Sequence, residues 1–336
     1  MRKKVTMQEI ADMLGISKVT VSKAINRREG VSDALREKIL STARALNYSK
    51  PGRTANHSRN FAFVCPKRFF LEDDAFYTSI YYYLNKQCIQ DNDTLDLYVV
   101  GTSDERFAKL PGRFENAMID GVFIAGQFQD AFLAKLLALP QAKVALDFYV
   151  SDLSIDAVIS DNFRMGTLVT DYLISRGHRK IGFVGDPLST SSISDRYFGY
   201  RKAMKLAGCP VEEAWGIINN DPFTGSYNNN MPLPADLPSA YVCHCDKAAF
   251  VLTQQLEKAG LRVPEDVSIV SFDNTNYAKL MHPQLTSVAF DQRGIALTGK
   301  QVMADRLIQP DSLPHVHYTQ SKLIIRDSVK DNIKQD

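Results

Sequence analysis

Short polar and basic side chains cluster in the stretch SKVTVSKAIN, residues 17–26. Lysine ammonium groups can donate to guanine acceptors and a valine can contact a thymine methyl, whereas hydroxyl and amide groups suit DNA phosphates. We expect three side chains to face bases: Lys18, Val19 and Lys23. We expect another set to hold the DNA backbone: Ser17, Thr20, Ser22, Asn26 and, further along the chain, Ser32.

Three short helices are expected to position these side chains. Thr6, followed by a glutamate three residues later, can cap a helix over residues 6–14. The apolar residues at helical spacing on this helix are Ile10, Met13 and Leu14. Gly15 can end it, a second helix begins at Ser17, and Ser32 can cap a third. This pattern predicts a helix-turn-helix whose second helix enters the major groove, with Thr6 added to the DNA-contacting residues.

Charge separates the first 60 residues from the rest of the chain. They hold 13 Lys and Arg against 5 Asp and Glu, a balance of +8, while the other 276 residues hold 27 against 33, a balance of −6. A positive field concentrated in one small module indicates a polyanion partner, in agreement with double-stranded DNA.

Composition also bounds the class of protein. No run approaches the roughly 20 apolar residues of a membrane span, and the amphipathic start lacks the apolar region of a signal peptide. Five cysteines form no dense framework, so disulfides are not expected. These features favour a cytoplasmic protein without a membrane partner.

The segment VTMQEIADMLGISKVTVSKAINRREGVSDALREKILSTARALNY resembles the DNA-binding head of LacI/GalR family regulators. The resemblance implies a hinge that inserts a leucine into the minor groove and kinks the DNA. Here the wedge position is Ser58, which is small and polar, so either the DNA bends less or another side chain such as His57 inserts. Arg53 and Arg59 can read a narrow minor groove electrostatically.

From Phe61 onward, short apolar runs alternate with helix-length stretches. The runs are FAFVC, LDLYVV, GVFIA, KVALDF, IGFVG, AYVC and VSIVSF. Buried parallel strands have this texture, and their alternation with helices predicts doubly wound α/β sheets with ligands outside the carboxyl ends of the strands.

The resemblance extends through the core, in DNFRMGTLVTDYLISRGHRKIGFVGDP, RYFGYRKAM, AGLRVPEDVSIVSFDN and KLIIRDS. It implies a core like periplasmic sugar-binding proteins, with two doubly wound lobes that close on a ligand. The expected domains are a helix-turn-helix domain at 1–49, a hinge at 50–60 and a core at 61–336. Lobe 1 spans about 61–160 and 291–320, and lobe 2 about 161–290 and 321–336.

The same resemblance implies an effector site between the lobes. Arg196, ahead of Gly199-Tyr200, and Asp273, in SFDN, match the family's ligand-binding arginine and aspartate. The full expected set is Phe76, Tyr77, Asp147, Arg196, Phe223, Cys245 and Asp273. Arginine and carboxylate groups suit sugar hydroxyls, and aromatic faces suit the C–H surface of a sugar. Salt bridging of Arg196 with Asp273, and core packing of the aromatic residues, are the alternatives.

Two other motifs are weaker. GIALTGK, residues 294–300, approaches a phosphate-binding loop, but Gln301 replaces the required hydroxyl and no strand immediately precedes it, so a helix with Ile295 and Val302 buried is expected. Cys243-His244-Cys245 and His315-Val316-His317 lie in strand-like segments, where neighbouring side chains point to opposite faces. We therefore expect no metal, no cofactor and no catalytic site.

Taken together, the sequence predicts a DNA-binding transcription regulator, a repressor in function, that acts as a homodimer on operator DNA. A small molecule, a sugar or sugar derivative, is expected to control its operator affinity. Two alternatives stay open: a regulator whose core only dimerises, and an α/β enzyme that carries a DNA-binding head.

Overall fold

The chain forms two compact units, residues 1–58 and residues 59–336. The computed structural model describes residues 6–25, 30–32, 35, 36, 38, 39, 42, 58–70, 76–114, 119–219 and 231–332. Three residues of the expected sites, Asn26, Arg53 and Phe223, lie outside the described residues, as does His57 of the hinge.

In the smaller unit, the first helix, α1 (Met7–Leu14), has the predicted capping box. The hydroxyl of Thr6 accepts from the backbone N–H of Glu9 at 3.2 Å, and the Glu9 carboxylate accepts from the backbone N–H of Thr6 at 2.7 Å. Gly15 ends the helix in the left-handed region, at φ +65°, which a glycine adopts without strain. Both signals were readable in the sequence.

The second helix, α2 (Lys18–Ile25), packs on the first through a small apolar core. Its buried members are Ile10, Ala11, Val21, Ala24 and Ile39. Met13, expected on the inner face, is instead 61% exposed, because Ala11 completes the buried face of α1 on the side away from Met13.

The larger unit contains two sheets. Lobe 1 is built on a six-stranded sheet in the order β10-β5-β4-β3-β1-β2, and every printed pair in it is parallel. Its strands are β1 (Asn60–Pro66), β2 (Thr94–Val100), β3 (Gly121–Ala125), β4 (Ala142–Leu146), β5 (Asp156–Ser160) and β10 (Val316–Thr319).

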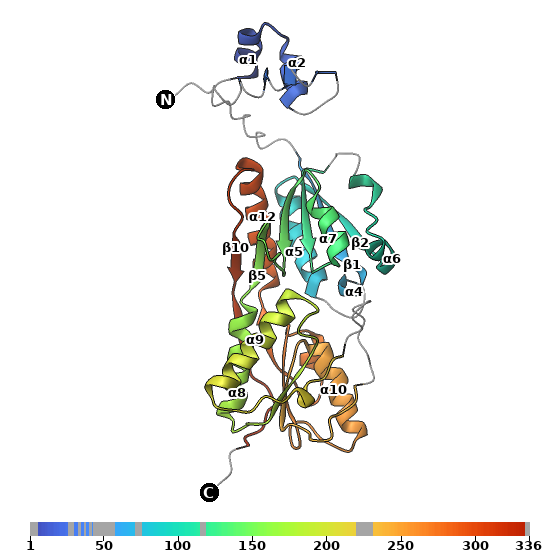
Figure 1. The fold of residues 1–336 in the computed structure, drawn as a ribbon, viewed down its shortest axis with the longest axis vertical. Coiled ribbons are helices and arrows are strands. Elements are labelled where there is room, and N and C mark those ends of the chain that lie inside the picture. Colours follow the sequence, from blue (N-terminus) through green and yellow to red (C-terminus); the bar gives the residue numbers. More distant parts are fainter. Residues whose placement is uncertain are drawn as a thin grey trace. The chain divides into compact units, whose positions relative to one another are not determined.

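Helices cover both faces of this sheet (Figure 1). They are α4 (Lys67–Phe70), α5 (Phe76–Gln90), α6 (Thr102–Arg106), α7 (Asp130–Leu137) and α12 (Gln292–Ile308). Side chains alternate along β1: Phe61, Phe63 and Cys65 join a cluster with residues of α5 and α12, whereas Ala62 and Val64 join a cluster with residues of α7. Burial on both faces explains why β1 reads as a continuous apolar run.

Lobe 2 is built on a five-stranded sheet in the order β11-β9-β8-β7-β6, with β11 antiparallel to β9. Its strands are β6 (Ile181–Val184), β7 (Ala240–Cys243), β8 (Ser268–Phe272), β9 (Thr286–Phe290) and β11 (Ser321–Ile324). Its helices are α8 (Asn162–Ser175), α9 (Ser191–Leu206), α10 (Asp246–Lys258) and α11 (Asn276–Leu280). Helices α8 and α9 lie on one side of this sheet and α10 on the other (Figure 1).

The described chain passes from one sheet to the other at residues 160–162, 290–292 and 319–321. The predicted fold class, a helix-turn-helix head with a core of two parallel α/β lobes, is confirmed. Short 3₁₀ turns occur at Gly112–Phe114 and Glu213–Trp215. Residues 231–238, which include three prolines, form no helix.

The segment that approaches a phosphate-binding loop lies within helix α12. Ile295 and Val302 are buried as predicted. The ammonium of Lys300 binds the carboxylates of Asp91 at 2.7 Å and Asp93 at 2.8 Å, so its charge joins α12 to the turn before β2. The segment therefore has a structural role in the packing of lobe 1.

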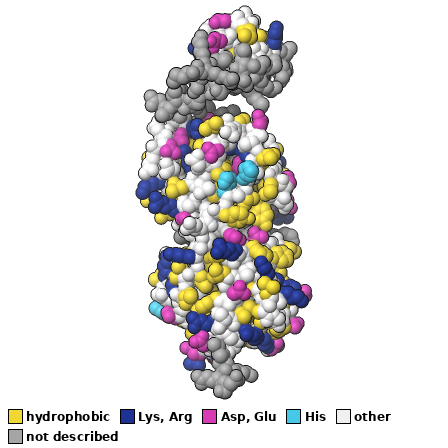
Figure 2. Space-filling model, turned by 90° about the vertical axis from the view of Figure 1, so that its left-hand side faces the viewer, with side chains coloured by type: hydrophobic (Ala, Val, Ile, Leu, Met, Phe, Trp, Pro, Cys, Tyr) yellow, Lys and Arg dark blue, Asp and Glu magenta, His cyan; other side chains and the backbone are white. Residues whose placement is uncertain are grey.

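Three observations bear on the class of protein. On the face shown in Figure 2, hydrophobic, basic and acidic side chains are interspersed over the described core. None of the described helices is long and apolar enough to cross a membrane. The five cysteines are all buried and form no disulfide.

Candidate functional site

The turn and second helix of the head present the expected DNA-contacting side chains. Lys18, Val19 and Lys23 are exposed, and Val19 has 64% of its surface open although it is apolar. The three residues predicted to face bases are thus available to DNA.

The hydroxyls of this region have local partners as well. The Ser17 hydroxyl accepts from the backbone N–H of Thr20 at 3.0 Å and lies 2.8 Å from the Thr20 hydroxyl, so it caps α2. The carbonyl of Ser32 accepts from the backbone N–H of Arg36, whose guanidinium reaches the carbonyl of Ala24 at 3.2 Å. Ser22 is half-buried. A serine that caps α2 can still offer its hydroxyl to a phosphate, so the prediction for Ser17 stands.

In the core, Arg196 of α9 is the centre of a buried polar cluster in lobe 2. Its Nε donates to Asn162 at 2.8 Å, one terminal nitrogen donates to the carbonyl of His244, and the other lies 3.5 Å from Asp273 Oδ1. The guanidinium also lies 4.8 Å and 4.9 Å from the ring centroids of two phenylalanines, Phe272 and Phe290. The intralobe ion pair considered from the sequence is therefore present.

Asp147 and Asp273 occupy corresponding places in the two lobes, one directly after β4 and the other directly after β8. Both have positive φ, +67° and +96°, which non-glycine residues adopt at a cost of about 1–3 kcal/mol. Such strain persists where the surroundings hold it, often at binding sites. Tyr77 donates to Asp147 at 2.9 Å, and burial raises the pKa of Tyr77 well above its ordinary value.

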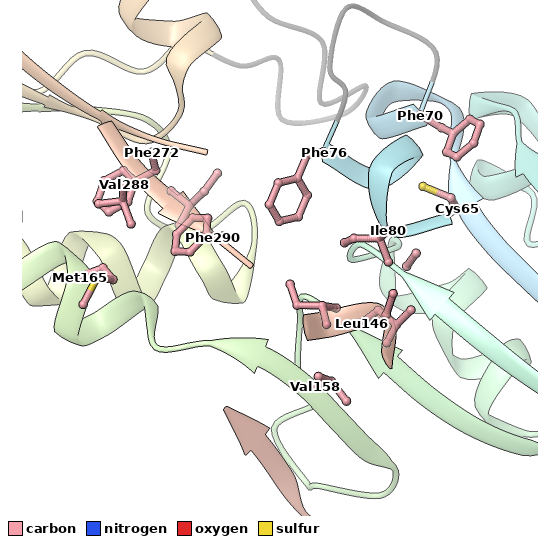
Figure 3. Close-up of a cluster of buried hydrophobic side chains, with 14 of the residues drawn as sticks. Cys65, Phe70, Phe76, Ile80, Leu146, Val158, Met165, Phe272, Val288 and Phe290 are labelled. Atoms are coloured by element: carbon pink, nitrogen blue, oxygen red, sulfur yellow. The ribbon is translucent and has the colours of Figure 1, made fainter. Parts of the chain in front are cut away.

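Phe76, the first residue of α5, packs at the junction of the lobes. Its ring meets the ring of Phe290 edge-on, with centroids 6.2 Å apart, and only 4% of its surface is exposed. Figure 3 shows Phe76 between Ile80 on its own helix and Phe290 on the strands of lobe 2. Phe76 therefore belongs to a hydrophobic cluster that continues from one lobe into the other.

The Cys243–Cys245 segment has a local structural role. The Cys245 sulfur accepts from the backbone N–H of Ala248 at 3.4 Å and caps α10. Burial lowers the pKa of His244 to about 3, and the positive charge of Arg196 adds to the effect, so its imidazole is neutral at physiological pH. No group of three or more His, Cys, Asp or Glu within the described ranges could hold a metal ion.

Sequence reasoning missed two contacts that join the lobes. The Gln127 side chain, after β3, accepts from the backbone N–H of Ser191 at 2.8 Å, and Tyr149 donates to Asp195 at 3.1 Å. Both partners in lobe 2 lie in the first two turns of α9, just ahead of Arg196. The only sequence signal was position, because Gln127 and Tyr149 each closely follow a predicted strand.

The core thus brings two carboxylates, one guanidinium, one neutral imidazole and several aromatic rings to the carboxyl ends of two parallel sheets. Such a set can bind a small polar ligand. Joined to a helix-turn-helix head, it defines a class: the DNA-binding regulators with a ligand-binding core.

Comparison with known proteins narrows this class to a family. Residues 6–50 match the bacterial regulatory proteins of the lacI family, and residues 170–329 match the periplasmic binding protein-like domain. The chain is therefore a DNA-binding transcriptional regulator with a lacI-family head and a periplasmic binding protein-like core.

Three similar proteins support this assignment. The HTH-type transcriptional repressor PurR of Escherichia coli O139:H28 is 28% identical over 343 residues, covering 98% of each chain. The regulator CCPA from Weissella paramesenteroides, with bound glucose, is 26% identical with a TM-score of 0.64, over 82% of this chain and 99% of that one. The lac repressor dimer bound to operator and the anti-inducer ONPF is 20% identical with a TM-score of 0.66, over 98% and 100%.

Proposed function

We propose that this regulator binds an operator as a homodimer and that a small polar ligand, a sugar or sugar derivative, controls its operator affinity from a site between the lobes. The observation that carries the proposal is the convergence of polar groups from both lobes: Tyr77, which donates to Asp147 in lobe 1, lies close enough to Asp273 of lobe 2 to feel its charge, and Asp273 lies 3.5 Å from Arg196. Both pairs follow the carboxyl ends of parallel strands, where ligands of doubly wound folds bind.

The chemistry of these groups favours a ligand with several hydroxyls. Carboxylates accept hydrogen bonds from hydroxyls and a guanidinium donates to them, while aromatic rings can cover the C–H face of a sugar. The glucose bound to the Weissella regulator, 26% identical to this chain, supports the same class of ligand.

The DNA side of the proposal rests on the head. Exposed Lys18 and Val19 at the start of α2 suit contacts with bases, and dimerisation would place two reading helices on a roughly palindromic site. The dimer of the lac repressor on its operator supports this arrangement. We place the protein in the cytoplasm, where the DNA is. The six effector residues within the described ranges and the lobe boundaries given above are part of this proposal.

A second candidate is a regulator whose core responds to no ligand. The observation that favours it is the set of contacts that already join the lobes: Phe76 with Phe290, Gln127 with Ser191 and Tyr149 with Asp195. A core held together in this way could serve as a dimerisation platform alone.

A thermal-shift screen against sugars, sugar phosphates and nucleobases separates the two candidates. A ligand that binds only the folded state adds RT ln(1 + [L]/Kd) to the free energy of unfolding and therefore raises the melting temperature. Arg196→Lys should weaken the affinity for any ligand found in the screen at least tenfold, since lysine cannot reproduce the planar guanidinium of arginine. Arg201→Lys, an exposed arginine on the same helix, is the matched control and should respond as the wild type.

No change in melting temperature with any compound would favour the core that only dimerises. A hit whose response survives Arg196→Lys would mean that the ligand binds elsewhere, and the assignment of this site would then be wrong.

A further inference from the structure

Lobe 1 contains a hollow of about 550 Å³ at the edge of its sheet opposite the proposed effector site. It lies at the amino-terminal ends of β3, β4 and β5, which are paired strands, beside the connection between α12 and β10. Figure 1 shows α12, β10 and β5 side by side. A volume between about 300 and 1,000 Å³ is typical of small-molecule sites. Nothing in the proposed function uses this hollow.

One wall of the hollow is held in place by Arg306 of α12. Its Nε donates to Asp156 at 2.8 Å, a terminal nitrogen lies 2.7 Å from the same carboxylate, and another donates to the carbonyl of Pro310 at 3.2 Å. The second oxygen of Asp156 accepts from the backbone N–H of His315 at 2.9 Å. The charge of Arg306 is therefore neutralised, and residues 309–315 are fixed around it.

Lys143 of β4 is the other cation that lines the hollow. Its ammonium donates to the carbonyls of Leu139 and Gln141, and both of these partners are neutral. An ammonium has three N–H donors, so one is left for a ligand. Burial lowers the pKa of Lys143, which means that its charge is only partly solvated, and no ion pair joins it to a carboxylate among the described residues.

We propose that this hollow binds a small organic acid, with its carboxylate on Lys143. The remaining surface suits an apolar body, because the hollow is also lined by Ile119, Ile155, Leu307 and three prolines, Pro140, Pro310 and Pro314. A carboxylate, that of Asp120, also lines the hollow and accepts from the backbone N–H of Asn60 at 2.9 Å. With one free lysine charge and one carboxylate in the lining, the hollow suits a monocarboxylate better than a doubly charged phosphate. A charge-assisted hydrogen bond in partly desolvated surroundings is about twice as strong as a neutral one and would distinguish the acid from its amide.

Hexanoate and benzoate, with hexanamide and benzamide as neutral controls, are suitable probes for the full-length protein in carboxylate-free buffer. Isothermal titration should show saturable binding of at least one acid and at least tenfold weaker binding of its amide. Lys143→Met, which keeps the length of the side chain but removes the charge, should weaken binding of the acid at least tenfold. Lys135→Met, an exposed lysine on α7 of the same lobe, should change it less than twofold.

A second variant tests the hollow without changing the lysine. Ser154→Trp places a large ring at an exposed lining position and should also abolish binding of the acid. Three outcomes would overturn the proposal. They are equal affinity for the acid and its amide, undiminished binding of the acid by Lys143→Met or Ser154→Trp, and no saturable binding of either acid.

Discussion

Mild acid should destabilise the core through His244. This imidazole lies directly after β7, is only 3% exposed, and its backbone carbonyl accepts from Arg196. Burial, together with the charge of Arg196, lowers its pKa to about 3, against about 6.5 for an exposed histidine in the unfolded chain. Between these two values the unfolded state binds a proton that the folded state does not.

The magnitude follows from this difference in pKa. Because the unfolded state holds more protons between about pH 3 and pH 6.5, the free energy of unfolding falls as the pH falls through this window. From pH 7.5 to pH 5.5 the unfolded histidine changes from about one-tenth to about nine-tenths protonated, which costs the folded state about 1.4 kcal/mol. Above pH 7.5 the contribution vanishes.

Urea unfolding of the full-length protein can measure this cost in the lobe that contains His244. The chain has one tryptophan, Trp215, which is buried in lobe 2 and donates to Asp236 at 3.1 Å, so its fluorescence reports the unfolding of that lobe. The wild type should lose about 1.4 kcal/mol more than His244→Gln between pH 7.5 and 5.5. Burial also lowers the pKa of His178, but this residue is present in both proteins, so its contribution cancels in the comparison.

A matched control is His315→Gln, an exposed histidine in lobe 1. It should lose as much stability as the wild type over the same interval. If His244→Gln loses the same amount as the wild type, then His244 is not a buried neutral imidazole, and the arrangement of the cluster around Arg196 would need to be redrawn.

Two further predictions concern the head and lobe 1. Lys18→Ala should reduce discrimination between operator and random DNA, whereas Ser17→Ala should weaken binding to both alike, because it removes the proposed phosphate contact together with the cap of α2. Equal losses for both variants in anisotropy titrations would contradict these roles. Lys300→Met leaves the buried carboxylate of Asp93 without its cation and should cost about 3–5 kcal/mol in thermal or urea unfolding monitored by circular dichroism, and a loss below about 1 kcal/mol would contradict the structural role of the pair.

Much of the fold was accessible to pattern reasoning because local signals and burial agree. The capping box at Thr6, the left-handed Gly15 and the seven apolar runs each correspond to an observed helix end or strand. No apolar run was named for β5, β9 or β11, whereas β10 overlaps the strand-like segment His315-Val316-His317. Strands β10 and β11 are half-exposed, and β5 begins at Asp156, a carboxylate that is buried only because Arg306 meets it from 150 residues away.

The candidate site was predictable in part, and through resemblance more than through physics. Arg196 and Asp273 are 77 residues apart, and no local pattern brings them together. His244 was judged only as a possible metal ligand, because its burial and neutral state depend on Arg196 and on the close packing of Gly185 against its ring. Tertiary contacts of this kind depend on how the sheets assemble, so the periodicity of the sequence does not predict them.

The central claim, that a ligand in the core controls the head, is tested most directly by measuring linkage in both directions. An operator selected from random DNA and a ligand from the thermal-shift screen would be titrated each in the presence of the other. We expect the ligand to change operator affinity by about 5–150-fold, and the operator to change ligand affinity by the same factor, as binding reciprocity requires. A ligand that binds the core while operator affinity stays the same would contradict the claim.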